Sequence, residues 1–356
     1  MMSDSARLLL AVDLDGDGAH PAAWRHSGRP PGAVLTAGGL RETVATAEAA
    51  GFTLATFADT PTPTPPGDGP DAVGRLEAGV RAAFVSTLTD RIGLGPTLHV
   101  TTTEPFHLAT QLASLDHTSR GRAAWVVGAA ADATSLATIG ASVPDAGAWR
   151  QEVLDVVDTA RLLWDSWQDD AVIKEVETGR YLDADRVHHV DFEGATFTVK
   201  GPLITPRPPQ GQVVVIAPAS LDIDDRADII LVNGPEAGER AALTFAEVEV
   251  VLGATVADAT DRAARLEEAT QWPDTGRIRH VGTADGLVEL LRSLAGTVSG
   301  VRLHPAVHAV DLRLLIGDVL PVLTESGLHR PPVPGDTLRT SLGLPRPANR
   351  FAAATL

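Results

Sequence analysis

Hydrophobic runs alternate with amphipathic stretches along almost the whole chain. Short runs of mostly apolar residues, such as Leu8–Val12 and Val213–Ala217, are typical of strands that are buried on both faces. Stretches such as Leu40–Ala50 instead place apolar side chains at helical spacing, and Gly51 follows where such a helix would end. The pattern predicts these strands: Leu8–Val12, Thr53–Ala58, Ile92–Val100, Ala123–Ala129, Val213–Ala217, Asp228–Val232, Ala246–Leu252 and Gly300–His304.

Most of the predicted strands are followed by a predicted helix. The helices cover Leu40–Ala50, Ala72–Leu88, Pro105–Asp116, Trp149–Trp167, Val256–Thr270, Ala284–Ala295 and Leu312–Ser326. Repeated strand–helix units in one chain of 356 residues predict a single α/β domain, a TIM (β/α)8 barrel spanning residues 1–356. A doubly wound sheet is the alternative. That fold usually begins with a glycine-rich turn, whereas the first strand here runs into the acidic DLDGDG.

Two segments depart from this rhythm. Residues 168–212, after the fourth unit, contain VHHVDFEGATFTV, in which two alternating runs flank Glu193 and Gly194. This pattern predicts a β-hairpin within an insertion. Residues 331–356 form a C-terminal tail, and the sequence LRTSLGLPRPANRF predicts an extended segment lying on the surface.

Composition narrows the function classes. The chain has 46 acidic and 29 basic residues, a formal net charge of -17, 44% hydrophobic residues and no cysteine. An acidic surface repels nucleic acid and anionic lipid, so neither is an expected partner. The absence of cysteine excludes disulfides, thiolate zinc sites and cysteine nucleophiles. Because we find no signal peptide and no apolar run long enough to span a membrane, we expect a cytoplasmic protein.

Polar residues follow the predicted strands at their carboxyl ends, where a barrel carries its active site. These residues are Asp13, Asp15, Asp59, Thr97, His99, Ser220, Asn233 and His304. Their convergence favours a pocket for a small molecule. Two of them have plainer interpretations, since Asp59 could cap the following loop and His99 could be a core residue.

The sequence predicts no metal site and identifies no catalytic residue. His188 and His189 would point to opposite faces of a strand, and Pro305 opposes a helix that could join His304 to His308. DLDGDG begins like a calcium loop, but the residues that follow do not complete the register. The chain has no GxSxG motif and no phosphate-loop lysine.

Two segments resemble a known family. Arg91–Trp125 and Leu162–Ile216 resemble the bacterial-luciferase-like flavin monooxygenases, in the branch that holds nitrilotriacetate and dibenzothiophene-sulfone monooxygenases. HPAAWRH at 20–26, FAD at 57–59 and TLRTSLGLPRPANRF at 337–351 also fit this branch, and the match is collinear over nearly the whole chain. The resemblance implies a TIM barrel with an inserted hairpin, which agrees with the strand pattern.

The resemblance also implies a chemistry. Reduced FMN would be supplied by a separate flavin reductase, and oxygen would be activated as the flavin C4a-peroxide to oxidise a small organic substrate. Because water would release the peroxide, such a site needs dry walls. The insertion at 168–212, with Trp167, Tyr181 and Phe192 in or beside it, is a candidate lid.

Relatives of this type commonly form homodimers through the helices beside the second and third strands. In the helix predicted at Ala72–Leu88, small residues permit a close approach of a second helix; they are Ala78, Gly79, Ala82 and Ala83. We therefore expect a homodimer.

The resemblance assigns two groups of site residues. Asp59, Thr97, Val126, Ala130 and Ser220 fall at positions that contact the flavin. The substrate pocket would include Trp24, His99 and Trp125.

The chain departs from the family at the expected flavin contacts. Where relatives read WNVVTS after SLDHxSxGR, Val126, Ala129 and Ala130 stand here without side-chain hydrogen-bonding groups. The usual HxxRY becomes DAGAW at 145–149. QAGxS becomes APAS at 217–220, in which proline removes an N–H donor and acidic residues follow.

Each lost charged hydrogen bond removes about 1.5–3 kcal/mol, so binding of the flavin phosphate is expected to be weak. Two interpretations remain open. The chain is either an active oxygenase that holds flavin mainly through its ring, or a non-catalytic paralogue that binds a partner protein. A deazaflavin enzyme is a third alternative, disfavoured because the matching segments belong to the flavin branch.

Overall fold

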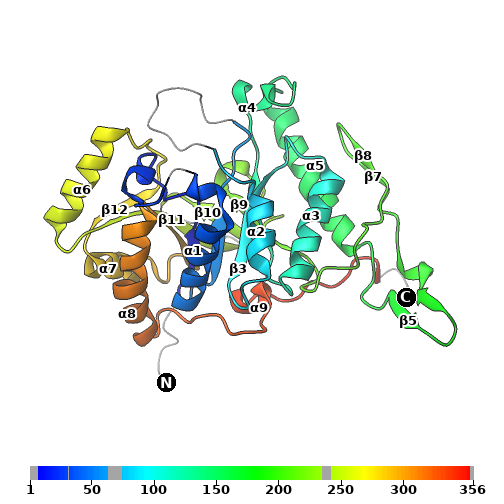
Figure 1. Ribbon diagram of the computed structural model, residues 1–356. Coiled ribbons are helices and arrows are strands. Elements are labelled where there is room, and N and C mark those ends of the chain that lie inside the picture. Colours follow the sequence, from blue (N-terminus) through cyan, green and yellow to red (C-terminus); the bar gives the residue numbers. More distant parts are fainter. Residues whose placement is uncertain (1–6, 31, 63–73, 235–241, 353–356) are drawn as a thin grey trace.

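A computed structural model describes residues 7–30, 32–62, 74–234 and 242–352, which form an α/β barrel (Figure 1). Within these residues, eight parallel strands pair into a closed ring, because β10 pairs with β11 as well as with β9. The TIM barrel prediction is therefore confirmed. Around the ring the strands are β1 (Leu9–Asp13), β2 (Leu54–Phe57), β3 (Gly93–His99), β4 (Ala124–Gly128), β9 (Val214–Pro218), β10 (Ile229–Val232), β11 (Leu243–Leu252) and β13 (Gly300–Pro305).

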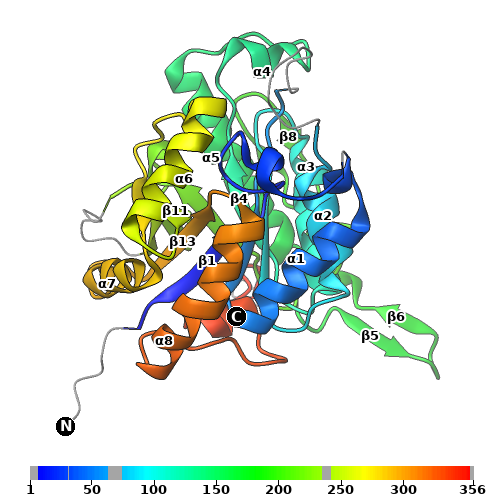
Figure 2. The same cartoon turned by 60° about the vertical axis from the view of Figure 1, so that its left-hand side comes forward.

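Helices cover the outside of the ring (Figures 1 and 2). They are α1 (Ala37–Ala50), α2 (Ala78–Ser86), α3 (Pro105–Thr118), α4 (Ala133–Ala137), α5 (Ala146–Asp165), α6 (Val256–Ala269), α7 (Ala284–Leu294) and α8 (Leu320–Glu325), the last preceded by π-helical turns at His308–Leu312 and Leu315–Val319. In the described part of the chain, no helix is long and apolar enough to cross a membrane. Helix α2 begins later than predicted, because the Glu77 carboxylate accepts the N–H groups of Gly79 and Val80 and caps it there.

The strands bury side chains on both faces. On β4, Trp125 points outward and meets the Trp164 ring edge-on, with 6.5 Å between ring centroids, while its Nε1 donates to the Leu98 carbonyl at 3.0 Å. Its neighbour Val126 points inward and joins a separate apolar cluster inside the ring. This alternation decides which residues of a strand can reach a pocket at the mouth of the barrel.

A ninth strand, β12 (Ile278–Gly282), was not predicted. The first residues of β11 pair with β10, and residues 248–252 pair instead with β12. The strand escaped prediction because Arg279 and His280 interrupt its apolar residues. It therefore extends the sheet beside the carboxyl end of β11 without entering the ring.

The insertion at 168–212 contains two antiparallel hairpins. β7 (Phe192–Glu193) and β8 (Thr198–Val199) form the predicted hairpin around Glu193 and Gly194. β5 (Val172–Glu175) and β6 (Arg180–Leu182) form another, which was not predicted. The β5–β6 hairpin extends away from the barrel near α3 and α5 (Figures 1 and 2).

The C-terminal tail corrects the expectation of an extended surface segment. It contains a short helix, α9 (Leu338–Leu342), that lies at the amino-terminal end of the barrel strands (Figure 1). Leu338 and Leu342 pack with the inward-facing apolar residues of the ring, and the buried Arg339 guanidinium donates two hydrogen bonds to Asp228 at 3.1 Å. The tail therefore closes the bottom of the barrel.

A buried carboxyl group connects this closure to the helix layer. Asp116 is fully buried at the end of α3 and accepts hydrogen bonds from the Ala123 N–H at 3.1 Å and from the Gln210 side chain at 2.6 Å. Gln210 in turn accepts the Arg339 N–H at 3.3 Å. Burial raises the pKa of Asp116 from 3.8 to about 6, in spite of the hydrogen bonds that lower it.

This pKa predicts a pH-dependent stability. Because the folded pKa of Asp116 lies above its ordinary value, its stabilising contribution is complete below pH 3.8 and is lost as pH rises through about 6. A pKa change of this size corresponds to about 3 kcal/mol in the free energy of unfolding. Asp116→Asn should abolish this dependence. From acidic to neutral pH, the free energy of unfolding of the native chain should therefore fall by about 3 kcal/mol relative to that of the variant. Urea unfolding at several pH values measures it, with the exposed Asp318→Asn as control. Parallel pH curves for Asp116→Asn and the native chain would contradict the assignment.

Candidate active site

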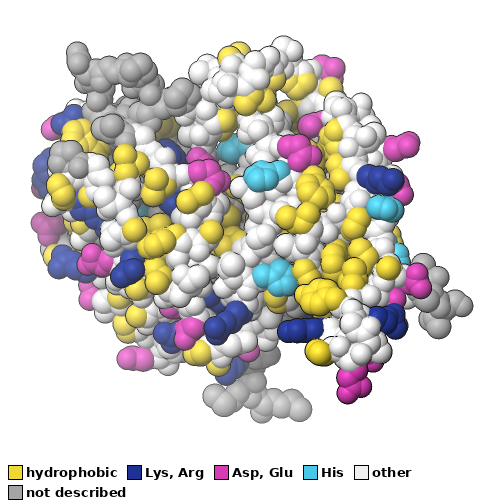
Figure 3. Space-filling view, turned by 45° about the vertical axis from the view of Figure 1, so that its right-hand side comes forward, with side chains coloured by type: hydrophobic (Ala, Val, Ile, Leu, Met, Phe, Trp, Pro, Cys, Tyr) yellow, Lys and Arg dark blue, Asp and Glu magenta, His cyan; other side chains and the backbone are white. Residues whose placement is uncertain are grey.

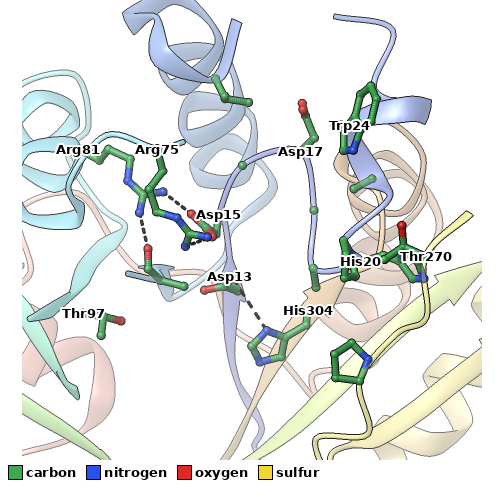
Figure 4. A pocket seen from close by; sticks show the side chains of 18 of the residues that line it. Asp13, Asp15, Asp17, His20, Trp24, Arg75, Arg81, Thr97, Thr270 and His304 are labelled. Carbon is green, nitrogen blue, oxygen red and sulfur yellow. Dashed lines mark hydrogen bonds and ion pairs between the residues drawn. The ribbon is translucent and has the colours of Figure 1, made fainter. Parts of the chain in front are cut away.

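A cavity of about 660 Å³ lies at the carboxyl ends of the barrel strands (Figure 4). Residues 15–24, which follow β1, form part of its wall. The ends of β1, β2, β3, β4 and β13, the chain that follows α6, and residues in and just before α2 contribute most of the rest. Active sites of TIM-barrel enzymes lie at this end of the strands. The cavity is therefore the candidate active site.

The floor of the cavity is charged. Glu247 on β11 accepts a hydrogen bond from the Arg302 Nε, and its Oε1 lies 3.1 Å from the Nε2 of His304. Arg277 approaches the other oxygen of Glu247 at 3.1 Å. Burial alone would raise the pKa of Glu247, but Arg302 and His304 hold it well below its usual range. Glu247 is therefore ionised near neutral pH.

Asp13, at the end of β1, lies beside His304. Its Oδ1 accepts a hydrogen bond from the Thr56 hydroxyl at 2.8 Å, and its Oδ2 lies 3.9 Å from the Nδ1 of His304. Figure 4 shows the two side chains meeting at the centre of the cavity. The imidazole thus lies between two carboxylates from opposite sides, Asp13 and Glu247.

One wall carries an ion triplet. Asp15 receives the guanidinium groups of Arg75 and Arg81, each at 2.7 Å from one of its oxygens (Figure 4). Arg81 also donates to the carbonyl of Ala58 at the end of β2. Burial raises the pKa of Asp15, and the two arginines oppose that effect. The triplet fixes the loop after β1 against α2.

Six of the residues expected from the sequence line this cavity, namely Asp13, Asp15, Trp24, Thr97, Val126 and His304. Thr97 and Val126 face it from paired positions on β3 and β4. Trp24 lines it from the loop after β1 and is 39% exposed. The structure therefore brings together two of the expected flavin contacts and one of the expected substrate contacts.

Asp59 and His99 lie close to each other near the mouth and are not among the lining residues. The Asp59 carboxylate accepts the N–H groups of Thr60 and of Ala78, the first residue of α2, and so supports the cap that Glu77 provides. His99 contacts the Asp59 carbonyl through its Nε2 at 3.2 Å and lies against Gly128, where a Cβ would be 2.8 Å from its ring. A side chain at Gly128 would displace this imidazole.

The other expected residues lie apart from the cavity. Trp125 points into the helix layer, because inward and outward positions alternate along β4 and Val126 takes the inward one. Trp125 is therefore not among the residues that line this cavity. Ala130 is buried beyond the end of β4, and Ser220 is exposed on the 3₁₀ turn Ala219–Leu221. No described residue of 168–212 lines the cavity, so the expected lid does not cover it in this structure.

The region expected to hold the flavin phosphate carries negative charge. The N-terminus of α5 is capped by Asp145, whose Oδ1 accepts the Ala148 N–H at 2.9 Å. Beside it, Arg150 is bound to the carbonyl and to the carboxylate of Asp222, at 2.9 and 3.0 Å. The Ala148 N–H and the Arg150 guanidinium are thus already hydrogen-bonded to carboxylates of this chain. A phosphate dianion does not fit these residues, whereas the Thr97 and Val126 wall fits an aromatic ring.

Sequence reasoning missed most of the charged residues of the site. Arg75, Arg81, Arg277 and Arg302 line the cavity, and Glu247 lies beneath it. A signal was present, because EVE at 247–249, RIR at 277–279 and RLH at 302–304 place charges two residues apart in apolar strands. Opposite charges with this spacing on neighbouring strands pair across a sheet. Among the described residues, no group of three or more histidines and carboxylates could hold a metal ion.

A family model described as luciferase-like monooxygenase matches residues 19–286. The chain belongs to this family. The branch resemblance seen in the sequence is confirmed, because nitrilotriacetate monooxygenase component A of Aminobacter aminovorans is 36% identical over 149 residues, which cover 41% of this chain and 32% of that protein.

Two further relatives match a longer part of this luciferase-like chain. N-acetyl-S-(2-succino)cysteine monooxygenase of Bacillus subtilis (strain 168) is 36% identical over 221 residues, 62% of this chain and 50% of that protein. A chain of the pristinamycin IIA synthase of Streptomyces pristinaespiralis is 33% identical over 214 residues, 60% of this chain and 68% of that protein. The chain thus aligns with half or less of the Bacillus and Aminobacter proteins.

Solved structures share the fold at lower identity. Long-chain alkane monooxygenase has a TM-score of 0.83 and 18% identity, with both chains covered completely. A riboflavin lyase, crystallised with modified FMN and riboflavin, has a TM-score of 0.83 and 21% identity, over 95% of this chain and 96% of that one. These likenesses establish the fold of the luciferase-like chain.

The buried ion pairs predict a large effect of a small change at Glu247. Glu247→Gln keeps the shape but leaves the buried Arg302 guanidinium without its anion, so we expect a loss of about 3–5 kcal/mol in the free energy of unfolding. Glu268→Gln, at an exposed position on α6, makes the same chemical change and should alter it by less than about 0.5 kcal/mol. Urea denaturation of both variants measures the difference. Equal stabilities would show that Glu247 does not hold the charged floor together.

Proposed function

We propose that this protein is a flavin-dependent monooxygenase that oxidises a small organic substrate in the cavity at the barrel mouth. The observation that carries the proposal is the joint presence of a luciferase-like chain and a cavity lined by Thr97 and Val126 at the carboxyl ends of its strands. Its relatives include monooxygenases for substrates as different as nitrilotriacetate and N-acetyl-S-(2-succino)cysteine. Family membership therefore supports the reaction class, whereas the substrate has to be inferred from the residues that line the cavity.

The chain's own residues would bind and shield the reactants. Val126 offers an apolar wall and Thr97 a hydroxyl group on the adjacent strand. When bound, reduced FMN supplies the electrons that activate oxygen, a chemistry that side chains lack. Trp24 would help to exclude water from the opening, and the paired charges of Asp15 with Arg75 and Arg81 would hold the loop that carries Trp24.

The phosphate of FMN would add little to binding. Pro218 has no N–H group to donate. The Arg150 guanidinium is already paired with the Asp222 carboxylate, so it is not available to bind the phosphate. We therefore propose that the flavin is held mainly through its ring. Reduced FMN would come from a separate flavin reductase, because the Aminobacter relative is itself named as one component of its monooxygenase.

A non-catalytic partner protein is the second candidate function. The carboxylates in the phosphate region favour it, because they oppose the binding of any flavin nucleotide. Two different chains of the pristinamycin IIA synthase are both similar to this chain, at 32% and 33% identity. Luciferase-like chains therefore occur together in one synthase, and this chain would be the member that supports a flavin-binding partner.

Flavin titration tests the first candidate. We expect FMN and riboflavin to bind with dissociation constants within about tenfold of each other, since one neutral hydrogen bond contributes roughly 0.5–1.5 kcal/mol and the phosphate has few donors here. Quenching of flavin fluorescence measures both constants. A preference for FMN of about a hundredfold would contradict the proposed binding through the ring.

Val126→Asn separates the two candidates. An asparagine at this cavity position offers the ring a hydrogen bond and is left unsatisfied without it, which lowers the melting temperature of the flavin-free variant. If added FMN restores that temperature, the ring site is intact and the oxygenase candidate stands. If it does not, the partner-protein candidate is favoured.

We also propose a homodimer in a cytoplasmic setting, although the face of α2 differs from the expected one. Ala78 and Ala82 pack inside the chain, which leaves Gly79 and Ala83 at or near the surface. Exposed apolar residues on the β5–β6 hairpin offer a further contact surface, on the side of the molecule that Figure 3 displays. Light scattering should give the mass of two chains, and the mass of one chain would refute the dimer.

A further inference from the structure

Two buried polar atoms at the cavity have no hydrogen-bond partner among the described residues. One is the Nε2 of His20, a side chain that is only 2% exposed, and the other is the Oγ1 of Thr270. Both residues line the cavity. A buried polar atom without a partner is costly, so native proteins rarely keep one without a use for it.

The surroundings of His20 fix which of its nitrogens carries the proton. Its Nδ1 accepts the Ala22 N–H at 3.0 Å, so in the neutral ring the proton is on Nε2. Burial lowers the pKa of His20, with a smaller opposing effect of Glu267, so the ring is neutral near pH 7. His20 therefore has one N–H donor without a hydrogen-bond partner at the edge of the cavity.

The orientation of the His20 ring is also set by packing. Its centroid lies 4.9 Å from that of Trp272 in an edge-on contact, and the Arg279 guanidinium covers the Trp272 ring at 4.2 Å. Trp272 follows Thr270 by two residues, and Figure 4 draws His20 and Thr270 next to each other, away from the Arg75 and Arg81 wall. The two polar atoms thus belong to one end of the cavity.

Arg277 adds a guanidinium group to the lining of the cavity, where Glu247 and Glu249 balance its charge. Its Nε donates to Glu247 at 3.1 Å, and its side chain is 26% exposed. An N–H, a hydroxyl and a guanidinium group match the oxygens of a carboxylate, which accept several hydrogen bonds and donate none. An ammonium group could donate to the Thr270 hydroxyl, but it would place donors against the His20 N–H and the Arg277 guanidinium. An alkyl group would leave both polar atoms unsatisfied.

We propose that His20 and Thr270 form a subsite that binds a carboxylate group of the substrate, with Arg277 as its cationic neighbour. The proposal deepens the proposed function and rests on it in so far as the ligand is taken to be that enzyme's substrate. The carboxylate occupies the His20 end of the cavity. The remainder of the molecule extends toward the Thr97 and Val126 wall.

The first test uses succinate as a probe and needs no flavin. Succinate, added to the flavin-free protein, should bind saturably in the millimolar range and change the tryptophan fluorescence, because Trp272 contacts His20. Succinamide has the same length without charge and should bind about tenfold more weakly, since hydrogen bonds to charged groups are the stronger ones. 1,4-Diaminobutane should not bind at this end. Equal binding of all three compounds would overturn the proposal.

Thr270→Val isolates the hydroxyl group. Valine has the same shape and suits the extended backbone of this position, with φ -159° and ψ 131°. Because the hydroxyl has no internal partner, the melting temperature should stay the same or rise. The dissociation constant for succinate should rise by about fivefold to tenfold, the value of one hydrogen bond. An unchanged constant would overturn the role of Thr270.

Two substitutions of His20 form a matched pair. His20→Asn keeps an acceptor near the position of Nδ1 for the Ala22 N–H but removes the donor at Nε2, so succinate binding should weaken by about tenfold. His20→Gln places an amide N–H near the position of Nε2 and should restore part of that binding. A merely structural role predicts the reverse order, because glutamine loses the bond to Ala22; that order would overturn the proposal.

Failure of this subsite and failure of the proposed function are distinguishable. A protein that binds succinate through His20 and Thr270 but takes up no flavin keeps the subsite and loses the oxygenase assignment. A protein that binds flavin, while succinate binding is absent or insensitive to both residues, keeps the oxygenase assignment and loses the subsite.

Discussion

The charged half of the barrel depends on the ion pairs and hydrogen bonds made by the buried carboxylate of Glu247. It receives Arg302 and His304 from β13 and Arg277 from the start of β12, so it joins strands on both sides of β11. Each cation would be costly to bury alone, and the shared anion makes their burial possible. Glu247 lies at the point where β11 leaves β10 and begins to pair with β12. The hydrogen bond to this carboxylate helps to hold His304 in the lining of the cavity.

The opposite half of the ring is apolar, and the contrast defines the site. Val126 and Ile216 belong to the inward-facing cluster, while Asp13, Arg302 and His304 line or support the other side. A flat aromatic ring is accommodated best against the first wall, and a polar substrate group against the second. The formal charge of -17 does not carry into the cavity, because Asp15 and Glu247 are each matched by arginines. The interior therefore has an electrostatic character different from that of the surface.

The hydrophobic periodicity was sufficient to predict the barrel strands, but it did not predict which face of each strand points into the barrel. In strands that are apolar on both faces, the pattern does not say which face is inward, so Trp125 and Val126 could not be distinguished before the structure. The β12 strand was missed because Arg277 before it and Arg279 within it are paired with Glu247 and Glu249, which lie about 30 residues away in the sequence. The α9 helix carried a readable signal, with Leu338 and Leu342 four apart and Gly343 as its end, but not its place under the barrel. The departures at the phosphate region were visible from the resemblance, whereas the pairing of Arg150 with Asp222 was not.

The closure of the barrel by α9 has a consequence for the order of events during synthesis. Leu54 on β2 and Phe245 on β11 point into the ring and meet Leu338 and Leu342 there. On the ribosome, β2 emerges long before residues 338–342, so the lower end of the growing ring stays uncovered until nearly every other element has been made. Exposed apolar surface of this kind invites aggregation or chaperone binding while translation continues. The nascent chain can complete its strands early, but its interior is sealed from water only when this late segment arrives.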